Sequence, residues 1–167
     1  MYEREEKNEL SMKMREGKYL TFSLDDEEYG ISILKVKEII GMMSITSVPQ
    51  TPGFVKGVIN LRGKVIPVID LRLKFSIEAT GYTERTCIIV VEIEGAARHL
   101  QIGIVVDTVS EVLNVKADDI EEAPTFGTGL RTDFILGMAK IDCNVKILLD
   151  IDKVLSENQV AILEEAV

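Results

Sequence analysis

The sequence predicts a mainly β protein made of two similar halves that pack against each other. Short apolar runs rich in Val and Ile recur along the chain, and β-branched residues favour strands. Several of these runs alternate with a two-residue period and are bounded by Gly, Asp or Asn, which favour tight turns. Aromatic residues make up only 5% of the chain, so Ile, Val and Leu must fill the core. This pattern is typical of a small barrel or sandwich.

The first half begins with a polar segment and continues with short strands. Residues 1–17 mix Glu, Lys and Arg with few apolar residues, which predicts a disordered or loosely helical tail. Strands are predicted at 19–24 and 29–33, on either side of an acidic turn. The segment 34–40 fits either a short helix or a strand. A connector at 41–53 contains two prolines that favour extended or turn geometry.

The most regular stretch is 57–72, GVINLRGKVIPVIDLR, which predicts a hairpin with Gly63 in a tight turn. The two-residue period predicts one apolar, core-facing side, formed by Ile59, Leu61, Val65, Pro67, Ile69 and Leu71. The other side is mixed and carries Val58, Asn60, Arg62, Lys64, Ile66, Val68 and Asp70. It fits either a partner surface or a seam between the halves. Arg62 is accordingly either a fork that holds a partner oxygen or a solvated turn residue.

The second half repeats the pattern of the first. After a polar link at 76–85, strands are predicted at 87–93 and 100–106. Blocks of similar sequence occur in the same order: 30–33 matches 103–106, 36–40 matches 109–113, 55–57 matches 135–137, and 70–71 matches 150–151. Each apolar residue on the core side of the first hairpin has an apolar counterpart between 139 and 151. These matches predict an internal duplication.

The duplication predicts the domain organisation. The expected segments are a tail at 1–17, a first barrel at 18–80, a second barrel at 81–151 and a C-terminal helix at 152–167. A unit of about 65 residues buries little apolar surface by itself. We therefore expect the barrels to pack on each other and to share a third apolar layer.

The C-terminal helix is predicted from its cap and its apolar stripe. Ser156 and Gln159 have the spacing of a capping box. Val160, Leu163 and Val167 follow at intervals that place them on one helical face, suited to packing on a barrel.

Charge and composition exclude several classes of partner. The net charge is −9, which disfavours binding to nucleic acid or to anionic lipid. No apolar run is long enough to span a membrane, and the first residues contain no signal-peptide core, so we expect a cytoplasmic protein without membrane insertion. Cys87 and Cys143 lie in apolar, strand-like contexts and are expected to be reduced, buried thiols.

No group of residues predicts catalysis or metal binding. His99 is the single histidine, the acidic stretch 118–122 lacks the spacing of a calcium loop, and the glycines at 127–129 lack the lysine of a phosphate loop. Asp70 and Asp150 are interpreted as strand-end caps. We expect no enzymatic activity, no metal and no cofactor. The alternatives are a small enzyme that uses one of these aspartates, or a ligand-sensing barrel with an apolar cavity above about 300 Å³.

Three segments resemble the CheW family of bacterial chemotaxis coupling proteins: EEYGISILKVKEI, TPGFVKGVINLRGKVIPVIDLRLKF and IGIVVDTVSEVL. The resemblance extends over roughly residues 19–163 and implies two five-stranded SH3-like barrels. The family also includes the regulatory domain of the chemotaxis histidine kinase CheA and the adaptor CheV, which carries a receiver domain. Because no kinase or receiver segment is present, the free-standing coupling protein fits best.

The resemblance also implies a function and its residues. It implies a non-enzymatic scaffold that couples CheA, through its regulatory domain, to the cytoplasmic tips of methyl-accepting chemoreceptors in membrane-associated arrays. Residues matching Val36, Glu38, Gly57 and Arg62 are implied in receptor or kinase coupling. The receptor tip is expected in the groove between the barrels, and kinase contact is expected to pair barrel two of one protein with barrel one of the other.

The place on the first hairpin where the coupling surface should lie follows from the repeat. The outer face and tip of this hairpin differ from the second half at Val58, Arg62 and Ile66. We therefore predict that the coupling surface lies beside this tip, and we add Val58 to the candidate residues.

Overall fold

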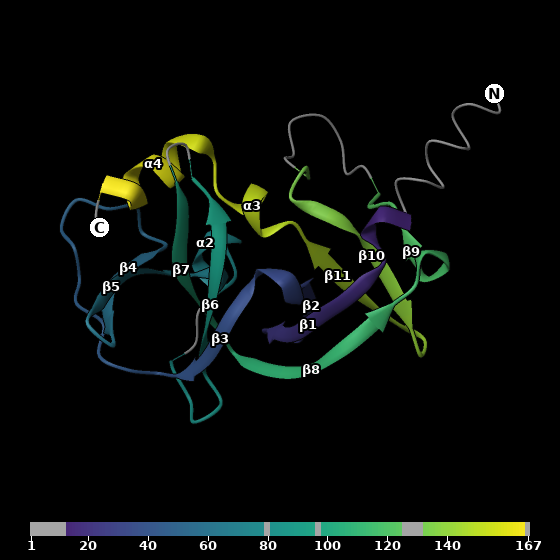
Figure 1. Cartoon of the computed structure of the whole chain (residues 1–167). Coiled ribbons are helices and arrows are strands. Elements are labelled where there is room, and N and C mark those ends of the chain that lie inside the picture. The colour runs from purple at the N-terminus through teal and green to yellow at the C-terminus, as the bar shows by residue number, and fades with distance from the viewer. Residues whose placement is uncertain (1–12, 79–80, 96–97, 125–131, 166–167) are drawn as a thin grey trace.

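The computed structural model describes residues 13–78, 81–95, 98–124 and 132–165. Its strands form a six-stranded and a five-stranded sheet that lie side by side (Figure 1). Both sheets are open rather than closed barrels, and their arrangement is consistent with the predicted SH3-like fold. The mainly β fold with a small C-terminal helix is thus confirmed. None of the helices in these residues is long and apolar enough to cross a membrane.

The six-stranded sheet contains, in spatial order, β8 (Thr108–Val115), β1 (Gly17–Leu24), β2 (Glu27–Ser32), β11 (Asn144–Leu149), β10 (Ile135–Ile141) and β9 (Ile120–Glu121). The five-stranded sheet contains β3 (Val36–Gly41), β6 (Cys87–Glu94), β7 (His99–Val106), β5 (Lys64–Asp70) and β4 (Val55–Leu61). The helical elements are η1 (Ile33–Lys35), α2 (Leu71–Lys74), η2 (Ala117–Asp119), α3 (Ile151–Val154) and α4 (Glu157–Glu165). The ambiguous segment 34–40 is therefore the end of η1 followed by β3.

The two repeats exchange their first hairpins. The β1–β2 hairpin of the first repeat joins β8 to β11 of the second, and the β6–β7 hairpin of the second joins β3 to β5 of the first. On one side each hairpin pairs in parallel, with Val68 opposite Gly103 and Leu148 opposite Gly30. On its other side it pairs antiparallel, β6 with β3 and β1 with β8. The sheets therefore do not follow the predicted boundary between residues 80 and 81, because a repeat identifies similar segments without specifying which of them pair.

Equivalent details recur in both repeats. The Asp70 carboxylate accepts a hydrogen bond from the backbone N–H of Arg72 at 2.9 Å, and the Asp150 carboxylate accepts one from Asp152 at 3.1 Å. Asp70 is the last residue of β5 and Asp150 follows the last residue of β11, and each caps the short helix that follows, as the sequence predicts. Asp70 is also fully buried against the Arg72 side chain, so it is not presented to a substrate.

The β4–β5 hairpin corrects the predicted division of its faces. Its turn residues, Arg62 and Gly63, have φ values of 53° and 85°, which fits a two-residue type I′ turn. Across such a turn an odd-numbered residue pairs with an even-numbered one, so Ile59 lies opposite Ile66. The faces were predicted by continuing one alternation through the turn. This was wrong for Val65 and Ile66, whereas Ile69 and Leu71 are buried as predicted. Ile66 is buried, whereas Val65 is 44% exposed.

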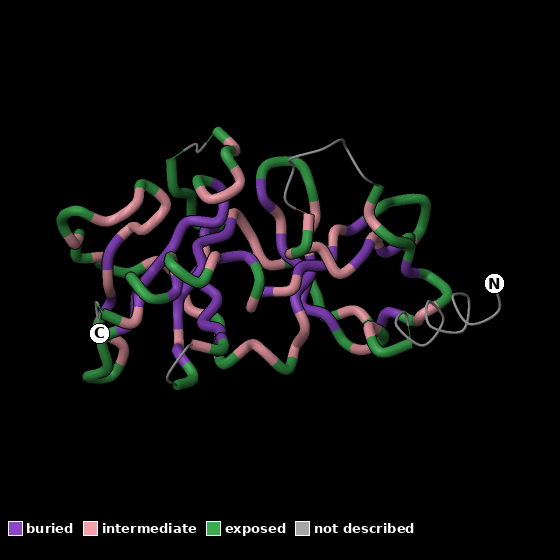
Figure 2. The backbone as a smooth tube through the Cα atoms, turned by 90° about the horizontal axis from the view of Figure 1, so that it is seen from above, coloured by how far each residue is buried: buried purple, intermediate pink, exposed green. Residues whose placement is uncertain are grey.

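Three apolar clusters build the core, and the middle one is the predicted shared layer. It joins side chains from both sheets, including Leu20, Phe22, Leu24 and Ile31 from the six-stranded sheet and Ile89, Val91, Ile93, Ile102, Ile104 and Val106 from the five-stranded sheet. A smaller cluster fills each sheet's own concave side. Buried chain therefore runs from one sheet through the middle into the other (Figure 2).

The C-terminal helix packs on the middle cluster through Val160 and Leu163. Its capping box is present, because the Gln159 backbone donates to Ser156 Oγ at 3.2 Å and the Ser156 backbone donates to Gln159 Oε1 at 2.9 Å. Val167, most of the predicted tail and the glycines at 127–129 lie outside the described residues.

The cysteine expectation was only partly right. Both thiols are free, but Cys143 is exposed and Cys87 is half-buried. Cys143 occupies the second position of the β10–β11 turn with a φ of 65°, the place that Gly63 takes in the first repeat. The flanking apolar strands concealed this turn in the sequence.

The tight contact at the β5–β7 join yields a stability prediction. A Cβ added to Gly103 would lie 2.7 Å from Ile88 Cγ2 and 3.3 Å from Val68 Cγ2, so Gly103→Ala forces buried side chains apart. We expect a loss of about 1–3 kcal/mol in unfolding free energy, measured by urea denaturation. Gly41→Ala, on β3 with open space around the added methyl, is the matched control and should cost nothing. An equal loss in both variants would contradict the packing explanation.

Candidate partner-binding site

The five predicted site residues lie on the two edges of the five-stranded sheet. Val36 and Glu38 are on β3, Gly57 and Val58 are on β4, and Arg62 forms the β4–β5 turn. Strands β3 and β4 are at opposite ends of the sheet order, so the sheet must curl for their side chains to meet.

Arg62 and Glu38 make that contact. Arg62 Nη2 donates to Glu38 Oε1 in an ion pair that links the two edges of the curled sheet. The Arg62 side chain is still 71% exposed, whereas that of Glu38 is 28% exposed. Arg62 is therefore neither a freely moving turn residue nor a buried structural one. The pair holds the guanidinium in one place and leaves much of it accessible.

The turn itself also fixes Arg62. Asn60 Oδ1 accepts a hydrogen bond from the Gly63 backbone at 2.8 Å, and this stabilises a turn in which Arg62 has a left-handed φ. Such a conformation is unfavourable for a residue with a Cβ. The side chain that bears the charge is thus positioned by local backbone structure as well as by Glu38.

Gly57 and Val58 position the connector through their backbone rather than offer side chains to a partner. Gly57 sits at a β-bulge with a φ of 141°, and an added Cβ would overlap the carbonyl oxygen of Thr46. Val58 and Thr46 exchange two backbone hydrogen bonds of 2.9 Å each. Only glycine allows the connector to approach β4 so closely. Thr46 carries no sequence signal for this role and was missed.

Val36 faces the interior, away from Arg62. It packs against the middle apolar cluster, and a register shift between Val36 and Glu38 redirects β3. Lys37 pairs with Glu92 on β6 at 2.9 Å and fixes the strand at this shift. The structure therefore brings Glu38 and Arg62 together, and it separates them from Val36. Ile66, predicted on the outer face, is buried instead.

An open hollow of about 630 Å³ lies beside the connector and was not predicted. Its lining includes Met42, Met43, Ser44, Ile45, Ser47, Lys56 and Tyr82. The Lys56 ammonium lies 5.8 Å from the centre of the Tyr82 ring, a cation–π contact. The apolar residues of the connector were the available signal, because a solvated loop seldom needs two adjacent methionines.

A second hollow of about 370 Å³ bears on the ligand-sensing alternative. It is lined by Tyr29, Lys74, Phe75, Ser76, Phe134, Ile135, Ile147 and Val154. Phe75 stacks on Tyr29 at 6.0 Å and on Phe134 at 5.4 Å. This hollow is larger than the size proposed for a ligand cavity, but it opens beside α2 and α3 rather than inside a barrel. The concave side of each sheet is filled by its own apolar cluster.

The charged groups of this region are arranged for contact rather than for catalysis. A hydrogen bond from Lys37 lowers the pKa of the Glu92 carboxyl. His99 is exposed at the start of β7 and lies 3.5 Å from Glu94. The arrangement, an arginine held by an ion pair on a curled sheet with exposed apolar side chains, is typical of protein-binding β modules.

Comparison with known proteins identifies which kind of module this is. Residues 18–159 match the CheW-like domain, and the chain therefore belongs to the CheW-like family, a family of chemotaxis scaffold proteins rather than enzymes. A chemotaxis protein CheW from Klebsiella aerogenes is 43% identical over 87% of this chain and 86% of its own length. Another from Treponema pallidum is 32% identical over 84% of this chain and 82% of its own.

A solved structure supports the same assignment. The crystal structure of the scaffolding protein TtCheW from Thermoanaerobacter tengcongensis superposes with a TM-score of 0.74 at 39% identity. The match covers 86% of this chain and 95% of that one. The predicted family is thus confirmed at the level of sequence and of fold.

Gly57→Ala tests the connector contact. The added methyl would overlap the Thr46 carbonyl, so we expect a loss of about 2–4 kcal/mol in unfolding free energy, combining overpacking with backbone strain. Gly63→Ala is the control, because its φ is also positive but the space around it is open. It should cost about 1 kcal/mol. Equal losses in a urea titration would show that backbone strain alone matters.

The Lys37–Glu92 pair predicts a specific pH dependence. Because the folded-state pKa of Glu92 is lowered, the pair stabilises the fold fully above the ordinary glutamate pKa of about 4.3. This contribution is lost as pH falls through the folded pKa. Glu92→Gln should therefore be less stable than the native sequence at neutral pH, with a difference that shrinks in acid. In a Lys37→Met background, urea denaturation should find a smaller change with pH, because Lys37 is the largest cause of the lowered pKa of Glu92.

Proposed function

We propose that this chain couples the histidine kinase CheA to the cytoplasmic tips of chemoreceptors. The relatives named as chemotaxis and scaffolding proteins support this class of function. The observation that carries the proposal is the position of Arg62, pinned by Glu38 yet mostly exposed. In this role the protein works in the cytoplasm and is recruited to receptor arrays at the membrane.

The surroundings of Arg62 suit a protein partner. Val65, across the hairpin from Asn60, is 44% exposed. Ile39, which follows Glu38 in β3 and points to the other face of that strand, is 45% exposed. Protein interfaces combine apolar anchors with charged groups at the rim, and arginine is enriched among the residues that dominate binding energy. A partner carboxylate, or the carbonyl groups at a helix C-terminus, would accept hydrogen bonds from the accessible N–H groups of Arg62.

The duplicated fold offers a second, related surface. Val145 is exposed beside the β10–β11 tip, as Val65 is beside the β4–β5 tip. The two tips are similar in shape but differ in charge, since the first carries Arg62 and Lys64 and the second carries Asp142. This supports the proposal that the kinase, whose regulatory domain belongs to the same family, pairs one tip region with the other.

Arg62→Ala is the direct test. We expect at least a tenfold loss of affinity, measured by titration calorimetry, for either a receptor cytoplasmic fragment or the CheA regulatory domain. The unfolding free energy should change by less than about 1 kcal/mol, because an exposed ion pair stabilises little.

Lys64→Ala is the matched control, since it removes an exposed charge from the same turn. It should leave both affinities within about threefold, or 0.7 kcal/mol. The proposed site is wrong if Arg62→Ala binds both partners normally, or if it unfolds the protein and so proves to be a structural residue.

A further inference from the structure

The chain passes from one sheet to the other at two places in its described part. After β2 it leaves the six-stranded sheet, runs through η1 and enters the five-stranded sheet at β3. After β7 it returns through Asp107 to β8. These passages make the hairpin exchange possible, because the first hairpin of each repeat precedes its passage and the remaining strands follow it.

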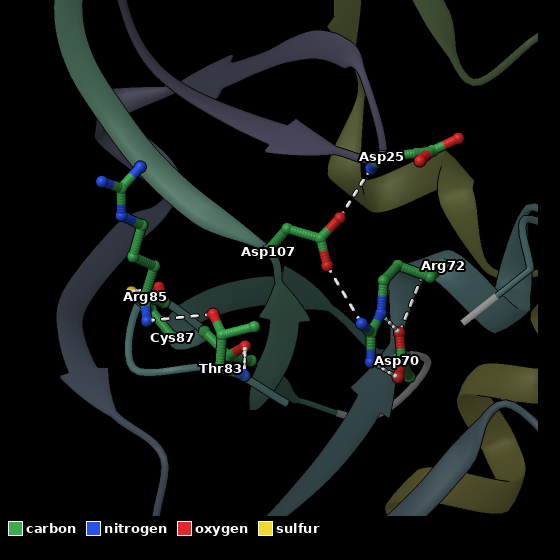
Figure 3. Close-up of polar contacts among 8 residues, drawn as sticks. Asp25, Asp70, Arg72, Thr83, Arg85, Cys87 and Asp107 are labelled. Atoms are coloured by element: carbon green, nitrogen blue, oxygen red, sulfur yellow. Dashed lines mark hydrogen bonds and ion pairs between the residues drawn. The ribbon is translucent and has the colours of Figure 1, made fainter. Parts of the chain in front are cut away.

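A partly buried ion pair, with the Asp107 side chain 27% exposed, clamps the second passage. Arg72 Nη1 lies 3.0 Å from Asp107 Oδ1, and the Arg72 side chain is only 3% exposed (Figure 3). Asp107 Oδ2 also accepts a hydrogen bond of 2.6 Å from the Asp25 backbone in the β1–β2 turn. Asp70 holds Arg72 from the other side through Oδ2 at 2.9 Å. The clamp thus connects the passage in the second repeat to α2 and to the β1–β2 hairpin, which both belong to the first repeat.

An ion pair of opposite polarity clamps the first passage. Asp152, the second residue of α3, lies with Oδ2 2.6 Å from Lys35 Nζ in η1. Its Oδ1 accepts a hydrogen bond of 2.9 Å from the Glu94 backbone at the end of β6. Asp152 is the repeat counterpart of Arg72, since both are two residues beyond the aligned aspartates. Lys35 aligns with Thr108, next to Asp107.

The opposite polarity of the two ion pairs matters because a second arrangement of the hairpins would bring like charges together. If each repeat kept its own hairpin, β5 would pair with β2 in place of β7, and β11 would pair with β7 in place of β2. The present registers, Val68 with Gly103 and Leu148 with Gly30, would then bring Arg72 to Lys35 and Asp152 to Asp107. Both contacts join like charges, which specifically disfavours that arrangement.

We propose that the charges of these two clamps select the exchanged arrangement of the hairpins over the one in which each repeat folds on itself. The apolar clusters discriminate weakly, because aligned positions of the repeats carry similar Val, Ile and Leu side chains. The clamps discriminate between the two arrangements because opposite charges meet in the exchanged one and like charges meet in the other. This inference concerns how the chain folds and does not depend on the proposed function.

Reversal of the first clamp separates its stabilising role from its selective role. Lys35→Asp with Asp152→Lys restores an ion pair in the native fold, so the urea midpoint should exceed that of either single variant. In the other arrangement the new carboxylate at position 35 would attract Arg72, and the new ammonium at position 152 would attract Asp107. We expect the yield of native monomer after refolding from urea, measured by size exclusion and by amide NMR spectra, to fall at least twofold.

Two comparisons make the test specific. Reversal of the Lys140–Glu121 pair, 2.6 Å apart and within one repeat, leaves the choice between arrangements unchanged and should refold with normal yield. At about 1 M salt, where the screening length is about 3 Å, the yields of the native and clamp-reversed proteins should converge. The proposal is overturned if the clamp-reversed protein refolds with the native yield in low salt, or if its midpoint is no higher than those of the single variants.

Discussion

The two parallel strand pairs, β5 with β7 and β11 with β2, are the constraint on which the rest of the structure depends. Each pair joins strands from different repeats, so neither sheet is complete without the other half of the chain. The shared apolar cluster follows from this exchange, because one face of each exchanged hairpin packs in the small cluster of its sheet and the other packs in the middle cluster. Gly30 and Gly103 lie in these pairs, and because they lack a side chain, Leu148 packs over Gly30 and Ile88 packs over Gly103.

The candidate site depends on the same constraint through the curl of the five-stranded sheet. The exchanged strands β6 and β7 separate β3 from β5 and β4 in the sheet, and the curl returns the two edges to each other where Glu38 meets Arg62. Gly57 contributes indirectly. It lets the connector approach β4, so that Thr46 pairs with Val58 along the outer edge of that strand. A binding surface therefore arises from residues whose own roles differ: one presents charge, one orients it, and two hold the backbone beneath it.

The sequence was informative wherever a local rule decides the outcome. Two-residue alternation located the strands, Asp70 and Asp150 were recognised as caps, and Ser156 with Gln159 defined the last helix. It was uninformative wherever pairing between distant segments decides. The exchange of hairpins, the Glu38–Arg62 pair and the role of Thr46 all depend on which strands become neighbours, and similar repeats offer more than one choice. Turn geometry was the intermediate case: the hairpin was found, but the change of parity through Arg62 and Gly63 meant that Val65 and Ile66 were assigned to the wrong faces of β5.

The exchange also bears on the origin of the chain. One repeat alone supplies β1 to β5 but places its first hairpin in a sheet that it does not otherwise build. In the arrangement seen here, a single-repeat ancestor would have required two copies, each lending its hairpin to the other, which is a domain-swapped homodimer. Gene duplication and fusion would then have converted an intermolecular contact into an intramolecular one. The two copies were thereby freed to diverge, and an assembly with two equal ends became a single chain whose two halves differ in charge.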